Sequence, residues 1–179
     1  MSEPTPRTAV GHPEPSEYDA FYANYIAEIP EGEILDVLER QAEAFGRLAE
    51  DVPPEKESFR YAPGKWSVRQ VVGHLADCER SFAFRALAIS RGDRQPLPGL
   101  DETLYMANAR FDDIPLTGLV DNLLAVRQAS LHLFRHLDDE AWKRSGIANG
   151  KPVSVRALAH IAAGHAEHHL KILRERYGV

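Results

Sequence analysis

The fold and the candidate site both depend on one C-terminal stretch, Val155-Arg-Ala-Leu-Ala-His-Ile-Ala-Ala-Gly-His-Ala-Glu-His-His-Leu-Lys-Ile-Leu-Arg-Glu-Arg-Tyr177. On a helical wheel at about 100° per residue, its large apolar side chains fall in one arc centred near Leu158. The stretch therefore predicts an amphipathic helix that buries this arc against the rest of the chain.

Four of the eight histidines lie in this stretch. His165 and His169 fall inside the apolar arc, about 20° either side of its centre, whereas His168 lies at its edge and His160 is nearly opposite. Buried imidazole nitrogens need partners. We therefore expect His165 and His169 to ligate a metal, with a hydrogen-bonded core pair as the alternative, and we do not expect His160 or His168 to be ligands.

Composition restricts the class of protein. A chain of 179 residues with a net charge of −6 is most simply one domain, and its acidic balance argues against nucleic acid as a partner. It has no apolar run of about 18 residues and no apolar N-terminal segment, so we expect no membrane partner and a cytoplasmic location. The single cysteine, Cys78, excludes an internal disulfide and a zinc site built mainly from cysteines.

Apolar periodicity predicts an all-α four-helix bundle. We expect a flexible tail over residues 1–17, where four prolines lie, and one domain over residues 18–179. Residues 18–29 would form a short helix or a packing arm. The predicted helices cover about residues 31–51, 68–91, 117–137 and 155–177, with Ser67 and Ser154 as N-caps. A long connection over residues 92–115 joins the second and third helices, and Asn149-Gly150 predicts a hairpin turn.

A third ligand is needed from another helix, because a catalytic metal centre commonly takes three protein ligands and keeps one position open. His74 lies on the second helix about 100° from the centre of its apolar arc, at a seam between helices. His132 and His136 form their own i,i+4 pair on the third helix. From spacing alone, His74 ranks only slightly above that pair.

The motif around His74 resembles the DinB/YfiT-like superfamily. It runs Lys65-Trp-Ser-Val-Arg-Gln-Val-Val-Gly-His-Leu-Ala-Asp-Cys-Glu-Arg80 and is paired with His165-Ala-Glu-His-His169 near the C-terminus. The resemblance covers about residues 31–177. It implies a four-helix bundle with up-down-down-up topology, which suits the long connection between the second and third helices. It also implies one divalent metal held by His74, His165 and His169, and often a homodimer.

The resemblance implies two kinds of activity, since family members are classed as metal-dependent hydrolases or as S-transferases of low-molecular-weight thiols. We therefore expect a metal-dependent enzyme that activates water or a thiol against a small electrophilic substrate. The alternative is a non-enzymatic, metal-stabilised stress-response or interaction module. Zinc is the simplest metal for histidine ligands, with nickel, iron or manganese as alternatives.

Glu79 is a carboxylate that the sequence places on the apolar face of the second predicted helix. It falls within about 50° of the middle of the second helix's apolar arc, where a carboxylate needs a partner such as Arg85 or a ligand imidazole. We expect Glu79 to orient a ligand or act as general base, with a structural salt bridge as the alternative. Asp77 could orient a ligand instead, and Cys78 is expected to pack. Tyr105, Met106, Asn108 and Arg110 of the long connection are candidates for a pocket wall.

Overall fold

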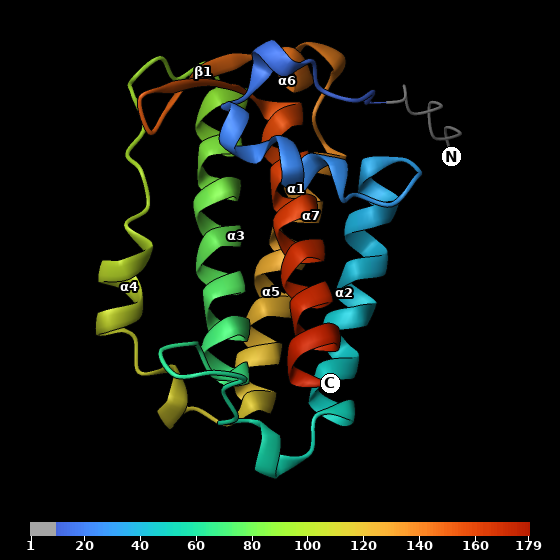
Figure 1. Cartoon of the computed structure of the whole chain (residues 1–179). Helices are drawn as coiled ribbons and strands as arrows, with labels where there is room; N and C mark the ends of the chain where they lie inside the picture. The colour runs from blue at the N-terminus through green and yellow to red at the C-terminus, as the bar shows by residue number, and fades with distance from the viewer. Residues whose placement is uncertain (1–9) are drawn as a thin grey trace.

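The structure is a computed structural model that describes residues 10–179. Its four long helices confirm the predicted all-α bundle (Figure 1). They are α2 (Ile34–Asp51), α3 (Val68–Ser90), α5 (Leu116–Arg135) and α7 (Val155–Ile172), and α7 continues into a π-helical turn, η5 (Leu173–Tyr177). None of the helices formed by these residues has the length and apolar character that crossing a membrane requires.

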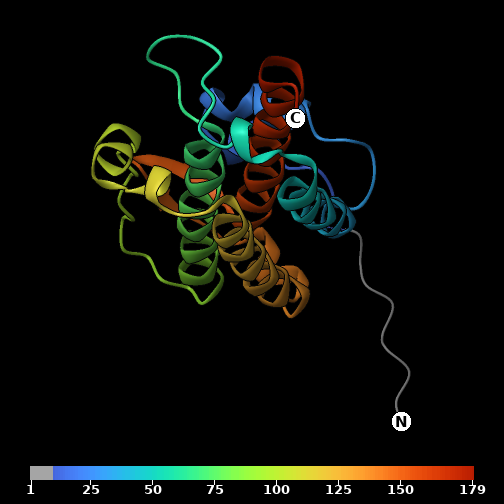
Figure 2. The same ribbon diagram turned by 90° about the horizontal axis from the view of Figure 1, so that it is seen from below.

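The connectivity is the predicted up-down-down-up order. In Figure 1, α2 and α7 run from the top of the view to the bottom, whereas α3 and α5 run upward. The parallel helices α3 and α5 pack on each other, and α2 and α3 each contact both α5 and α7. Residues 91–115 return along the outside of the bundle and include α4 (Glu102–Asn108) and η4 (Phe111–Asp113) (Figure 2). Parallel neighbours require this long crossover.

The predicted caps set where the helices begin. Ser67 and Gln70 form a reciprocal capping box at the start of α3, and Ser154 accepts a hydrogen bond from the Ala157 amide at the start of α7. The chain leaves α3 through Gly92, whose φ of +83° is in the left-handed region that favours glycine. The sequence therefore placed the N-terminus of α3 and of α7 at the observed residue.

The predicted hairpin is present and closes the top of the bundle. Strands β1 (Ser145–Ala148) and β2 (Lys151–Ser154) pair antiparallel across Asn149 and Gly150, which both have positive φ. Leu97 of the long connection bridges to this hairpin, donating its amide to the Ile147 carbonyl at 2.8 Å. The short helix α6 (Asp139–Lys143) leads from α5 into the hairpin.

The predicted N-terminal tail differs from the structure where the structure describes it. Residues 1–9 of that prediction lie outside the described residues. Residues 10–17 instead pack on the bundle, because the partly buried Glu17 carboxylate accepts hydrogen bonds from Arg156 and from the Ser154 hydroxyl. Short turns, η1 (Pro15–Glu17) and η2 (Ala20–Tyr22), then lead into α1 (Ala23–Ala27).

Helix α1 lies directly against α7, so residues 18–29 form both a short helix and a packing arm. Contact is closest at Gly164, where a Cβ would lie 2.2 Å from the Tyr25 carbonyl oxygen. Only glycine allows this approach. The glycine in the middle of the histidine-rich helix therefore brings Tyr25 next to the histidines.

The core consists of two apolar clusters, stacked along the bundle axis. Every long helix contributes to both. The upper cluster includes Leu38, Phe82, Leu131 and Leu158, and the lower one includes Phe45, Leu75, Leu123 and Leu170. Along each helix, buried polar side chains lie between the two sets: Gln41, Glu79, Arg127 and His165.

Candidate metal centre

His74, His165 and His169 converge between α3 and α7. Each is at least nine-tenths buried, and one ring nitrogen from each lies within 4.8 Å of the other two. The Nε2 atoms of His74 and His165 are 3.1 Å apart. The i,i+4 spacing sets His165 and His169 on successive turns of α7, and His74 meets them from α3. The structure thus brings together the three residues that the sequence singled out as ligands.

Burial keeps all three imidazoles neutral. It lowers the pKa of His74 from 6.5 to about 4 and that of His169 to about 3, while His165 is shifted well below 6.5, and the neighbouring histidines add to the shifts of His165 and His169. A neutral imidazole keeps one nitrogen lone pair free to bind a cation. The ring nitrogens are thus in the form that ligates a metal.

The residues fit a divalent metal. Nδ1 of His169 is buried and has no hydrogen-bond partner among residues 10–179. One ring nitrogen from each histidine lies within 4.8 Å of the others, so a single cation could be shared by all three. Three neutral nitrogens suit zinc and also nickel or iron. A buried polar atom left without a partner is costly, and a shared cation would remove that cost.

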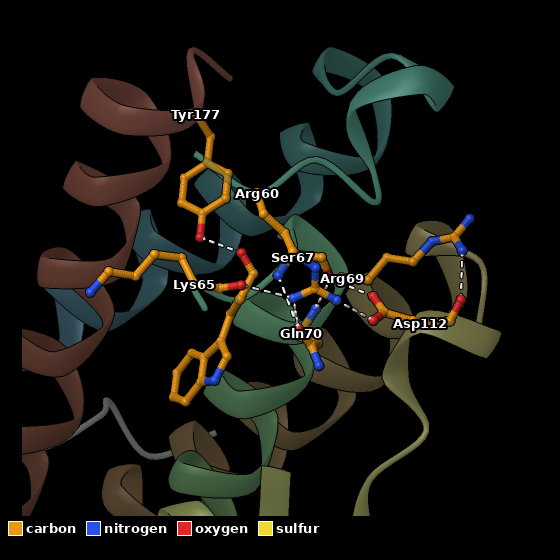
Figure 3. Close-up of polar contacts among 8 residues, drawn as sticks. Arg60, Lys65, Ser67, Arg69, Gln70, Asp112 and Tyr177 are labelled. Carbon is orange, nitrogen blue, oxygen red and sulfur yellow. Dashed lines mark hydrogen bonds and ion pairs between the residues drawn. The ribbon is translucent and has the colours of Figure 1, made fainter. Parts of the chain in front are cut away.

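The wall around the centre is aromatic and is fixed by the start of α3. The Trp66 ring lies 4.7 Å from the His74 ring and is stacked 6.5 Å from that of His169. The Tyr177 hydroxyl holds Trp66 by donating to its carbonyl oxygen at 2.7 Å (Figure 3). Trp66 therefore shields two of the three histidines.

The polar contacts drawn in Figure 3 fix the same end of α3 to the long connection. Asp112 accepts hydrogen bonds from the Ser67 hydroxyl at 2.5 Å and from Arg60 at 2.7 Å, and Arg69 donates to its carbonyl oxygen. Arg60 also bonds to Gln70 of the capping box. These contacts fix the N-terminal turns of the helix that carries His74.

Glu79 does not contact the histidines as the sequence led us to expect. Its two carboxylate oxygens accept hydrogen bonds from Nε and Nη2 of Arg127 on α5, at 2.9 and 3.0 Å. Arg127 also donates to the Leu38 carbonyl and the Gln41 side chain. Because both oxygens are engaged inside the core, the structure favours the salt bridge over an orienting or general-base role.

Glu102 is the carboxylate that the sequence reasoning missed. It lies at the start of α4, with Oε2 3.9 Å from Nε2 of His74, and is half exposed. Burial raises its pKa. Its only sequence signal was a place in the long connection. The expected wall residues Tyr105, Met106, Asn108 and Arg110 are not among those that line the cavity described below.

Asp77 and Cys78, which precede Glu79 on α3, make contacts that require no catalytic role. Asp77 pairs with Arg80 at 3.5 Å on the same helix. Cys78 is buried, with Sγ 3.6 Å from Nε2 of His74, and burial raises the pKa of its thiol to about 12. A thiol that stays protonated is a poor nucleophile. Cys78 therefore packs against the centre, as predicted.

The other described histidines do not belong to the cluster, although the His168 ring lies 5.3 Å from that of His169. His168 is partly exposed and lies 3.5 Å from the Glu28 carboxylate. His160, placed by the wheel opposite the apolar arc, is nonetheless buried, because the N-terminal segment covers it and brings the His12 ring within 4.7 Å. His132 and His136 are exposed, and Nδ1 of His136 lies 2.6 Å from the His132 carbonyl oxygen.

A cavity of about 330 Å³ leads to His165. It extends along α3 from Cys78 to Arg85 and lies under the hairpin and the N-terminal segment. Its wall combines apolar and polar side chains from several elements, and among them are Tyr22, Tyr25, Ser81, Phe82, Leu100, Glu102, Lys151, Leu158 and Ile161. The volume is at the small end of the range for small-molecule sites.

The family is decided by a sequence match over most of the chain. The family model described as the DinB superfamily matches residues 37–173, which include the three histidines, all of α3, α5 and α7 and most of α2. The chain belongs to the DinB superfamily.

One curated relative of this DinB-superfamily chain comes from Oceanobacillus iheyensis and is named "Putative metal-dependent hydrolase". It is 26% identical over 141 residues, which are 77% of this chain and 80% of that protein. The fold also matches the solved structure of YfiT from Bacillus subtilis, described as "a probable metal-dependent hydrolase with an unusual four-helix bundle topology". That match has a TM-score of 0.68 and 21% identity and covers 94% of both chains. At this identity the second likeness concerns the fold.

Proposed function

We propose that this protein is a divalent-metal-dependent enzyme in which His74, His165 and His169 hold the metal, with zinc as the first candidate. The observation that carries the proposal is the convergence of three buried, neutral imidazoles, one of which, His165, lines a cavity. Such a cation would supply Lewis-acid chemistry and lower the pKa of a water or thiol ligand, so that the nucleophile forms near neutral pH.

The surrounding side chains have three roles in this proposal. Trp66 and Phe82 cover the imidazoles and exclude bulk water, which strengthens the electrostatic interactions within. Tyr25 packs its ring 5.7 Å from that of His165 and fixes its orientation. Glu102 places negative charge beside His74 at the open side, where it stabilises positive charge on the centre.

Hydrolysis of a small electrophile is the reaction we favour, since the curated relative from Oceanobacillus iheyensis carries the name "Putative metal-dependent hydrolase". Transfer of a low-molecular-weight thiol is the second candidate, kept because the cavity could admit a small thiol as well as water. A purely structural metal is less consistent with the site. Structural zinc usually takes four protein ligands, whereas the cluster within residues 10–179 has three and adjoins a cavity. A homodimer and a cytoplasmic location stay predictions.

The test compares the zinc-loaded wild type with His165→Ala and the matched control His136→Ala, an exposed histidine outside the centre. Two reactions are followed: hydrolysis of 4-nitrophenyl acetate, and conjugation of cysteine to 1-chloro-2,4-dinitrobenzene. The proposal predicts that at least one reaction depends on metal, is lost in His165→Ala and is kept in His136→Ala. Equal rates in all three proteins for both reactions would contradict it, and the reaction that survives in the wild type separates hydrolase from transferase.

A further inference from the structure

Arg85 is a buried cation without a carboxylate partner. Arg85 is only 5% exposed, and its Nη2 donates a hydrogen bond of 2.8 Å to the Pro98 carbonyl. The sequence offered Arg85 as a partner for Glu79, but that carboxylate pairs with Arg127 on the other side of α3. Within residues 10–179, no carboxylate lies within ion-pair distance of the Arg85 guanidinium.

A buried guanidinium without a carboxylate partner is energetically unfavourable. A guanidinium does not deprotonate in proteins, so burial cannot be relieved by loss of the proton. Its desolvation is repaid only by a counter-charge and by hydrogen bonds to its five donors. Arg127 shows the satisfied case, with Glu79, the Leu38 carbonyl and Gln41 around one guanidinium. Arg85 lacks the counter-charge that Arg127 has.

The cavity that ends at His165 is where the missing counter-charge could bind. Arg85 and His165 both line it, and Cys78 and Arg85, two turns apart on α3, mark about 10 Å of its length. The Arg85 guanidinium lies at the Pro98 carbonyl of the long connection. The wall of the cavity also carries the apolar side chains of Phe82, Leu158 and Ile161.

The other charges on the wall are accounted for. Lys151 pairs with Asp19 at 3.8 Å, and Glu102 lies beside His74. The Tyr22 hydroxyl is neutral, because burial raises its pKa by more than the Arg85 guanidinium lowers it. The unmatched charge at the end of the cavity away from the histidines is therefore positive.

We propose that the cavity binds a small, otherwise apolar carboxylate, with the carboxylate on Arg85 and the reactive end of the molecule towards His165. The planar guanidinium favours a carboxylate, because two parallel N–H···O bonds fit its geometry. The small volume admits a molecule about the size of an arylacetate. The inference rests on the proposed function only in taking this ligand to be the substrate.

Binding is tested with 4-fluorophenylacetate and its neutral analogue 4-fluorophenylacetamide, followed by fluorine NMR. Each probe is titrated into the wild type, Arg85→Gln and the control Arg80→Gln, which removes an exposed arginine from the same helix. All titrations are made with zinc-loaded and with chelator-treated protein. In the chelator-treated protein, a carboxylate can bind at Arg85 but cannot ligate a metal. Titration of this form therefore tests the present inference independently of the metal centre.

The expected result is saturable binding of the acid in both arms, weakened about 10- to 100-fold in Arg85→Gln and unchanged in Arg80→Gln. The wild type should prefer the acid over the amide, a comparison that holds even if a variant folds poorly. A melting temperature that is unchanged or raised in Arg85→Gln is also expected, because an unpaired buried charge is removed. No saturable binding, equal binding of acid and amide, or equal binding by wild type and Arg85→Gln would overturn the inference.

Discussion

The Glu79 carboxylate and the Arg127 guanidinium form a two-point ion pair in the interior, with N–O distances of 2.9 and 3.0 Å. The pair lies between the two apolar clusters, and Gln41 extends it from Arg127 to the Ala163 carbonyl on α7. A polar network thus connects all four helices at the level of the histidines. We infer that this network fixes the register of α7 against α3.

Replacing Glu79 by Gln should destabilise the protein by about 3–5 kcal/mol, because it leaves the Arg127 charge buried and unpaired. The double variant Glu79→Leu with Arg127→Met should recover part of that loss, since apolar replacement of a buried pair is often neutral. Urea unfolding of the three proteins measures both effects. Unchanged stability together with lost activity in Glu79→Gln would instead favour the general-base role that the sequence suggested.

Replacing Gly164 by Ala should destabilise the protein by about 1–3 kcal/mol, because the new Cβ would collide with the Tyr25 carbonyl and push α1 away from α7. The matched control is Gly46→Ala on α2, where nothing lies within 4 Å and the better helix propensity of alanine should stabilise by up to about 1 kcal/mol. Thermal unfolding compares them. Stabilisation by both substitutions would show that α1 does not pack as described.

His160 should make the free energy of unfolding depend on pH. Burial lowers its pKa from 6.5 in the unfolded chain to about 4 in the folded protein. Between these values the unfolded state binds a proton that the folded state does not. The stabilising contribution of the neutral ring is therefore complete above pH 6.5 and is lost as pH falls towards 4.

His160→Leu should flatten this pH dependence by up to about 1.4 kcal/mol per pH unit. Denaturant unfolding of wild type and variant at several pH values between 4.5 and 7.5 measures the difference, and the remaining histidines cancel because both proteins carry them. Parallel stability curves for the two proteins would show that folding does not lower the pKa of the His160 ring.

Glu102→Gln should weaken zinc binding by roughly 10-fold, because it removes the negative charge beside His74 while leaving the histidines in place. Asp113→Asn is the control, since it removes an exposed carboxylate of the same connection. Competition with a zinc chelator gives both affinities. Equal weakening by the two substitutions would mean that only overall charge matters.

Periodicity and capping chemistry predicted the bundle well because those signals are local. Ser67, Ser154 and Asn149-Gly150 each determine a boundary from their own side-chain or backbone preferences. The N-terminal segment was harder to predict, because its order depends on Glu17 meeting Arg156, far away in the sequence. Composition rich in proline gave no sign of that contact.

The candidate site was predictable where its signals are local and not where they depend on packing between helices. His165 and His169 share a helix face, so spacing alone selects them, whereas His74 needed the surrounding motif. The ion-pair partner of Glu79 could not be predicted from the sequence. Helical spacing indicates which face of a helix a side chain occupies but not which helix packs against that face. The sequence suggested Arg85, whereas Arg127 on α5 is the observed partner and Arg85 lines the cavity instead.

The central claim, that three histidines form one metal centre, is tested most directly by zinc stoichiometry. Purified wild type, His74→Ala, His165→Ala, His169→Ala and the control His136→Ala are loaded, desalted and analysed for metal. The account predicts about one zinc per chain in wild type and His136→Ala, and marked loss in each of the other three. Full zinc retention in all three ligand variants would contradict it.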